Sequence, residues 1–138
     1  MIVYLDASVA LRLVLGEPGR LAEWPRVEAA VASALTEVEC LRVLDRLGRQ
    51  GALTADDVAD RRAAVYRLLE AVELVDVARL VLRRASEPFS TPLGTLDAIH
   101  LSTALAWRDA RKRDLTMVTH DRALATAARA SGFEVLGG

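Results

Sequence analysis

Four acidic residues, far apart in the chain, lie close to the expected starts of helices. Asp6 follows the apolar run Ile2 to Leu5, and Asp121 follows the apolar segment that ends in MVTH. Glu39 lies in TEVE, and Asp97 lies in TLD, after a loop with two prolines and a glycine. In open α/β sheets the carboxyl ends of the strands share one edge, so acids at such junctions can converge there.

Convergence of the four carboxylates would define their chemistry. Two carboxylates about 5 Å apart repel by about 3 kcal/mol at an effective dielectric constant near 20. A divalent cation relieves this repulsion, and oxygen ligands favour Mg²⁺ or Mn²⁺. The sequence has no Cys/His cluster that would favour zinc. Cations of this kind activate water for attack on phosphodiesters, so the pattern indicates metal-assisted hydrolysis.

Each acid also has a purely structural explanation, because carboxylates and hydroxyls stabilise helix N-termini. The candidates for such roles are Asp6 or Ser8 as a cap of the first helix, Thr36 with Glu39 as a capping box, Thr95 as a cap with Asp97 in the first turn, and Asp121 as an N-cap. One observation favours function: Asp97 heads the helix TLDAIHLSTALAW, which is apolar on nearly every side and is expected to be buried.

The elements that must position these acids alternate between strand and helix. Strands are expected at Ile2–Leu5, Val31–Ser33, Val72–Val75, Leu115–Val118 and Phe133–Leu136. Helices are expected after Asp6, briefly through Trp24, from Thr36 to about Gly48, over Thr54–Glu70 and Val77–Ala85, from Thr95 to the basic cluster Arg111–Arg113, and over Asp121–Ser131. This alternation predicts an α/β fold with a mostly parallel central sheet of four to five strands and helices on both faces.

Length and composition fit one globular domain over residues 1–138. The chain has 52% hydrophobic, 27% charged and 4% aromatic residues, and its formal net charge is -1. A near-neutral chain lacks the uniform basic charge of many nucleic-acid binders, although basic residues can still gather on one face. Cys40 is the single cysteine, the N-terminus MIVYLDAS is unlike a signal peptide, and no apolar run reaches membrane-spanning length. We therefore expect a cytoplasmic protein without a membrane partner.

The acidic motifs resemble those of the PIN-domain nucleases, and among them the VapC-like toxins of bacterial toxin–antitoxin pairs. The matching segments are VYLDAS, SALTEVECLRV, TLDAIHLSTAL and MVTHDRALATAARASGFEVL, which together span almost the whole chain. The resemblance implies a three-layer α/β/α PIN-like fold and an acidic quartet of Asp6, Glu39, Asp97 and Asp121 that binds Mg²⁺ or Mn²⁺. Glu37 is a ligand in place of Glu39 only if the alignment shifts by two residues.

The resemblance also implies an activity and partners. The expected activity is endonucleolytic cleavage of single-stranded or looped RNA, in which a metal-activated water attacks in line and leaves a 5′-phosphate and a 3′-hydroxyl. The expected partners are the RNA substrate, a small VapB-like antitoxin and a second copy of the chain in a homodimer.

Other polar residues near these motifs receive lesser roles. Thr119, ahead of Asp121, looks like a small hydroxyl residue that positions a water or caps a strand end, and Ser8 is similar. Arg42, one turn beyond Glu39, is the best basic candidate to hold Glu39 or a substrate phosphate. The histidines and the cysteine are interpreted structurally: His100 as a satisfied core residue, His120 as an exposed loop residue, and Cys40 as a small buried hydrophobe.

Three alternatives compete with the nuclease hypothesis. A haloacid-dehalogenase-type phosphotransferase needs a D-x-D motif, but Ser8 is the third residue of this segment. A receiver domain needs a lysine after its fifth strand, and none follows Leu136. A PIN-like binding module with a degraded metal site is the strongest alternative, and the presence of all four acids argues against it.

Overall fold

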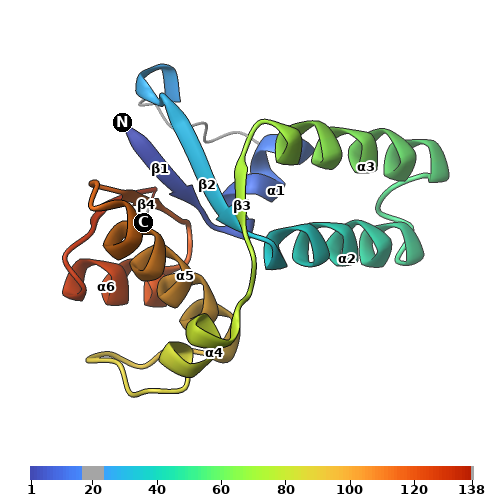
Figure 1. The fold of residues 1–138 in the computed structure, drawn as a ribbon. Helices are drawn as coiled ribbons and strands as arrows, with labels where there is room; N and C mark the ends of the chain where they lie inside the picture. Colours follow the sequence, from blue (N-terminus) through green and yellow to red (C-terminus); the bar gives the residue numbers. More distant parts are fainter. Residues whose placement is uncertain (17–23, 138) are drawn as a thin grey trace.

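A five-stranded parallel sheet organises the computed structural model, which describes residues 1–16 and 24–137 (Figure 1). The strands have the order β3-β2-β1-β4-β5 and are all parallel. They are β1 (Ile2–Leu5), β2 (Ala29–Ser33), β3 (Glu73–Val75), β4 (Thr116–Val118) and β5 (Glu134–Leu136). The expected α/β fold is therefore confirmed, with all five strands present.

Helices connect the strands and cover the sheet on both faces. They are α1 (Ala7–Leu15), α2 (Leu35–Arg49), α3 (Ala55–Glu70), α4 (Arg79–Ala85), α5 (Thr95–Arg111) and α6 (Arg122–Ala130), with a 3₁₀ turn at Trp24–Arg26. The short helix expected to run through Trp24 lies mostly outside the described residues. Within the described ranges, none of the helices combines the length and hydropathy that a membrane crossing requires.

The alternating side chains of β1 divide the core into two faces. Tyr4 points to the face covered by α5 and α6, where it packs in a cluster with Leu101 and Leu124. Val3 and Leu5 point to the opposite face, where they pack with Val9 of α1. Strand β1 is buried along its whole length because both of its faces are covered.

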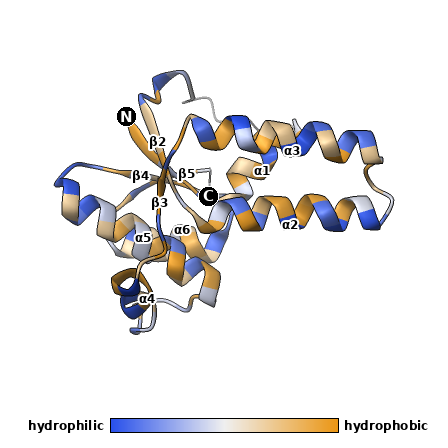
Figure 2. Cartoon of the chain, turned by 45° about the vertical axis from the view of Figure 1, so that its right-hand side comes forward, coloured by the Kyte–Doolittle hydropathy of each residue, from blue (hydrophilic) through white to orange (hydrophobic). Residues whose placement is uncertain are grey.

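Helices α1, α2 and α3 have a further apolar cluster of their own. Its buried members come from all three helices: Ala10, Val14, Cys40, Leu44, Val65 and Leu69. Helices α2 and α3 run side by side and extend away from the sheet, with hydrophobic and hydrophilic residues interleaved along both (Figure 1, Figure 2). Helix α2, which carries Glu39, thus packs mainly against α1 and α3.

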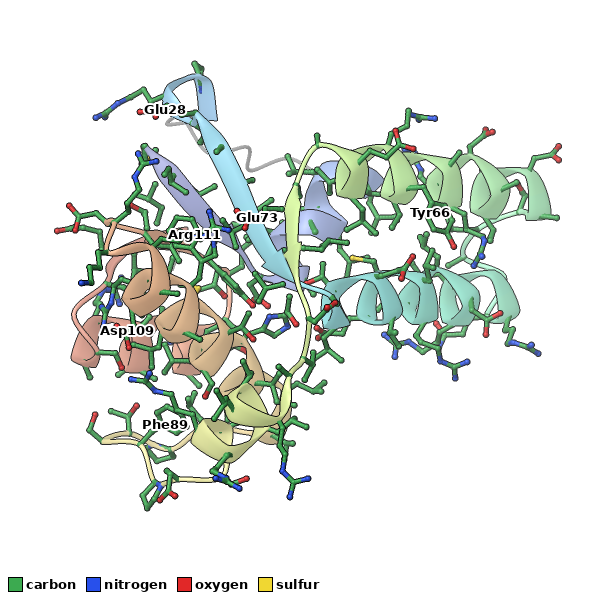
Figure 3. The ribbon with its side chains drawn as sticks, viewed as in Figure 1. Glu28, Tyr66, Glu73, Phe89, Asp109 and Arg111 are labelled. Atoms are coloured by element: carbon green, nitrogen blue, oxygen red, sulfur yellow. The ribbon has the colours of Figure 1, made fainter. Side chains whose placement is uncertain are left out.

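On the other face of the sheet, ion pairs and a hydrogen bond connect the long helix α5 to its neighbours. Arg111 donates to Glu73 at 2.5 Å, and Trp107 Nε1 donates to the other oxygen of Glu73 at 3.2 Å, which links α5 to the edge strand β3 (Figure 3). Arg84 of α4 donates to Asp109 of α5 at 3.0 Å. These contacts supplement the buried packing of α5, the helix that carries Asp97.

Two of the expected helix caps are wrong. Helix α2 begins at Leu35, and the nearby hydroxyl that accepts from its backbone is Ser33, whose Oγ accepts the Leu35 N–H at 3.1 Å. Thr36 is buried inside the first turn, and its hydroxyl has no hydrogen-bond partner in the described part of the chain. Helix α5 has Gly94 as its N-cap with no side-chain cap bond, so Thr95 is not its cap. Capping therefore does not explain Glu39 or Asp97.

Candidate metal-binding active site

Asp6 lies at the carboxyl end of β1 and is only 5% exposed. Its backbone N–H donates to Val118 at the end of β4, which brings the ends of the two strands together. One carboxylate oxygen, Oδ2, accepts from the hydroxyls of Ser8 at 2.8 Å and Thr119 at 2.7 Å. Asp6 has the backbone torsions of an N-cap but makes no side-chain cap bond. Its buried carboxylate is therefore oriented by hydroxyls rather than by the helix.

Glu39, on α2, is connected to the neighbourhood of Asp6 by a histidine. His100 of α5 is fully buried, and its Nε2 lies 2.5 Å from Glu39 Oε1 and 3.9 Å from Asp6 Oδ1. The other ring nitrogen, Nδ1, lies 2.7 Å from the hydroxyl of Tyr4. Burial lowers the pKa of His100, but the hydrogen bond and charge of Glu39 outweigh it and raise the pKa above its ordinary value. Three elements thus meet at one buried ring.

Asp97 has a carboxyl group whose pKa is raised. Burial, followed by the charges of Asp121 and Asp6, raises its pKa from 3.8 to about 6. The charge of Glu39 adds to this rise, whereas His100 opposes it. Among the described residues Asp97 makes no side-chain hydrogen bond that would compensate. The structure therefore places Asp97 in the electrostatic field of the other three acids without a dedicated partner.

Asp121 follows β4 and caps α6. Its Oδ1 accepts the Leu124 N–H at 2.9 Å, so the predicted N-cap role is confirmed. Its own backbone N–H donates to Thr119 Oγ1 at 3.0 Å. Thr119 consequently joins Asp6 to Asp121, and its single hydroxyl proton is committed to Asp6. It orients a carboxylate, and its predicted role in positioning a water stays a prediction.

The carboxylates share a pattern that bears on metal binding. In Asp6, Glu39 and Asp121, one oxygen is held by donors of the protein, while the other makes no hydrogen bond within residues 1–16 and 24–137. No three Asp, Glu, His or Cys side chains of those residues are already grouped as a metal site. The donor set nevertheless fits a hard divalent cation, because it consists of oxygens and its charges repel one another.

Arg42 does not hold Glu39. Its side chain is exposed, and within the described chain the ionic partner of Glu39 is His100. Glu37 is partly exposed and has no contact with His100 in the same region, so Glu39 is the acid of α2 that reaches the other candidates. Arg42 is left with a possible contact to substrate alone.

The structural interpretations of the remaining residues are mostly confirmed. Cys40 is buried, and burial with the nearby charges of Glu39 and Asp6 raises its pKa to about 12, which keeps the thiol protonated. His100 is a satisfied core histidine as expected, but its link to Glu39 was missed. His120 is half-buried, because its Nδ1 hydrogen-bonds the Gly137 carbonyl at 2.9 Å, so its assignment as an exposed residue is wrong.

A cavity of about 680 Å³ lies next to the acids without including them. It is formed by the end of α4, the loop from Ser86 to Leu93 and the first turns of α5, where Thr95 and Ala98 line it. Asp97 is on the same helical turn but is absent from the lining. The acids therefore do not form this cavity.

The raised pKa of Asp97 predicts a pH dependence of stability. Between about pH 4 and pH 6 the folded protein retains a proton that the unfolded chain has released, so the free energy of unfolding of the metal-free protein should fall as the pH rises. Urea denaturation at pH 4.5 and pH 7.0, with EDTA present, measures this change. In Asp97→Asn the decrease should be smaller, and an identical decrease in both proteins would contradict the assignment.

A parallel α/β sheet with acidic residues at its carboxyl edge fits the metal-assisted hydrolysis of phosphodiesters. The chain belongs to the PIN-domain family, whose sequence model matches residues 3–130. It is 31% identical over 139 residues to Ribonuclease VapC47 of Mycobacterium tuberculosis (strain CDC 1551 / Oshkosh), with 95% of this chain and 93% of the relative covered. It is 31% identical over 138 residues to Ribonuclease VapC49 of the H37Rv strain, with 97% and 94% covered.

Solved structures share the fold at low sequence identity. VapBC2 of Rickettsia felis, bound to a DNA fragment from its promoter, aligns with a TM-score of 0.66 and 15% identity over 99% of this chain and 98% of that one. VapC20 of M. tuberculosis, described as a sarcin–ricin loop cleaving toxin, aligns with a TM-score of 0.60 and 18% identity over 100% and 98%. The α/β/α architecture expected from the resemblance is thereby confirmed.

Proposed function

We propose that the protein is a metal-dependent endoribonuclease and the toxin component of a VapBC-like pair. One observation carries the proposal: acids from four separate segments influence one another at the carboxyl edge of the sheet, and Asp97 among them has a pKa raised to about 6. The relatives named as VapC ribonucleases, which match over nearly their full length, support the same activity.

Asp6, Glu39, Asp97 and Asp121 are the proposed ligands of Mg²⁺ or Mn²⁺. The cation would neutralise charge on the scissile phosphate and lower the pKa of a bound water. The residues of this chain provide orientation: Ser8 and Thr119 hold Asp6, and the backbone of α6 holds Asp121. Ligation requires the side chains to rearrange, because the acids are not grouped as a metal site in the described residues.

The proposed substrate is single-stranded or looped RNA. An unpaired strand can enter a surface site that a duplex cannot reach, and an exposed arginine such as Arg42 can contact its phosphates. Because the formal net charge is only -1, binding should be weak and should decrease at high salt. The proposed partners are a VapB-like antitoxin and a second copy of the chain, in the cytoplasm.

A cleavage assay with a labelled RNA that has both a stem and a single-stranded loop tests the activity. With Mn²⁺ we expect cuts in the unpaired region, no cuts with EDTA, and at least about 100-fold slower cleavage by Asp6→Asn, because loss of a ligand should cost at least as much as loss of a supporting residue. Asp60→Asn, at an exposed position on α3, is the matched control and should cleave normally. A folded parent that binds the antitoxin but never cleaves RNA would favour the binding-module alternative.

A further inference from the structure

His100 occupies a place between the proposed ligands that packing alone does not explain. Its side chain is 1% exposed, yet both ring nitrogens have polar partners, from β1 on one side and from α2 on the other. The ring of Tyr4 also meets the His100 ring edge to face, with centroids 5.9 Å apart and an angle of 74° between the planes. The imidazole is therefore fixed in both position and rotation.

The partners determine which ring nitrogen acts on Glu39. A carboxylate can only accept hydrogen bonds, so Nε2 must carry the proton that is shared with Glu39. Nδ1 then either accepts from the Tyr4 hydroxyl or donates to it, and both arrangements satisfy the pair. Burial, followed by the charge of Asp6, raises the pKa of Tyr4 well above its ordinary value, so this hydroxyl keeps its proton. Nε2–H is thus the donor toward the site.

Glu39 needs such a donor more than Asp6 and Asp121 do. Its side chain has three torsions and is 20% exposed, and its neighbour Val38 is 55% exposed, so this turn of α2 borders solvent. Asp6 and Asp121 have short side chains that are already held by hydroxyl or backbone donors. For Glu39, the described residues supply His100 as the donor. When Nε2–H holds Oε1, the side-chain torsions of Glu39 are restricted. The same contact therefore also fixes the direction of the second carboxylate oxygen, Oε2.

We propose that His100 is a positioning residue: it holds the Glu39 carboxylate so that its second oxygen is available to the divalent cation. The inference rests on the proposed function, since it concerns the same site. His100 does not itself bind the cation. Groups that hydrogen-bond to metal ligands commonly act in this way. Removal of such a group lowers metal affinity by about 10- to 100-fold.

Two amide substitutions separate positioning from packing. In His100→Gln the side-chain amide nitrogen is at the ε position, like Nε2, and can still donate to Glu39. In His100→Asn the amide nitrogen is at the δ position, like Nδ1, and falls short of Glu39. Both variants lose the ring and should lose stability. We expect Mn²⁺ affinity, measured by isothermal titration, to be at least about 10-fold higher in His100→Gln than in His100→Asn.

The same comparison in the Glu39→Gln protein shows whether the effect of His100 on Mn²⁺ affinity depends on Glu39. In Glu39→Gln, which should itself bind Mn²⁺ weakly, His100→Gln and His100→Asn should have equal affinities. Urea denaturation of every variant gives the independent measure of packing. If Mn²⁺ affinity instead follows stability, or if the two amides bind equally in the otherwise unchanged chain, the positioning role is wrong.

The two proposals fail in different ways. A parent chain that neither binds Mn²⁺ nor cleaves RNA would contradict the proposed function, and the positioning role with it. A parent that does both, with folded His100→Asn binding Mn²⁺ as tightly as the parent, would contradict the positioning role alone. Tyr4→Phe is the control for the opposite side of the ring: it removes only the hydroxyl and should change Mn²⁺ affinity less than about 3-fold, below the effect of losing a supporting residue.

Discussion

Asp97→Asn should abolish Mn²⁺ binding and slow RNA cleavage by at least about 100-fold, by the same reasoning as for Asp6. The substitution should also make the metal-free protein more resistant to urea at pH 7.5, because it removes a charge that burial and Asp121 disfavour. A shift to about 6 in a partly exposed group corresponds to a gain on the order of 1 kcal/mol after screening by solvent.

The opposite signs of these effects make the test specific. A residue that only capped α5 would destabilise the protein when replaced, and metal binding would be unaffected. Asp60→Asn, at an exposed position on α3, is a suitable control for loss of a surface charge. Saturable Mn²⁺ binding by folded Asp97→Asn with the affinity of the parent would contradict the metal-site hypothesis.

Leu101→Ala should lower the free energy of unfolding by about 2 to 5 kcal/mol. Leu101 is completely buried on the face of α5 that packs against Tyr4, Met117 and Leu124, so truncation leaves a cavity between α5 and the sheet. Urea denaturation, monitored by circular dichroism, measures the change.

A matched substitution on the same helix controls for helix propensity. Leu96 is 50% exposed, so Leu96→Ala should change the free energy of unfolding by less than about 1 kcal/mol. Equal losses in the two variants would mean that α5 is not anchored through its buried face. Because Asp97 and His100 are on this helix, Leu101→Ala should also weaken Mn²⁺ binding under conditions in which it remains folded.

The sequence allowed the sheet to be predicted because its strands are apolar runs that end in polar residues. The run Ile2 to Leu5 predicts a strand buried on both faces, and Asp6 directly after it predicts an acid at the carboxyl edge. Thr119 and Asp121 were expected at the same edge for the same reason, and the structure joins them to Asp6.

Contacts between distant segments could not be predicted from such patterns. The hydrophobic pattern of α5 indicates that His100 is buried, but its partner Glu39 is 61 residues away and on another helix. The start of α2 was misjudged for a local reason, because two hydroxyl residues compete there: Ser33 accepts from the backbone, while Thr36 is turned into the core. Sequence spacing alone does not choose between two hydroxyls that are both suitable caps.

The separate apolar cluster of α1, α2 and α3 has a consequence for the site. Glu39 is carried by that helical layer, whereas Asp97 and His100 are carried by α5 on the other side of the sheet. A cation held jointly by Glu39 and Asp97 would connect two helical layers that lie on opposite faces of the sheet. Its binding energy would then contribute to the cohesion of the fold, and thermal unfolding would shift upward with the concentration of Mn²⁺.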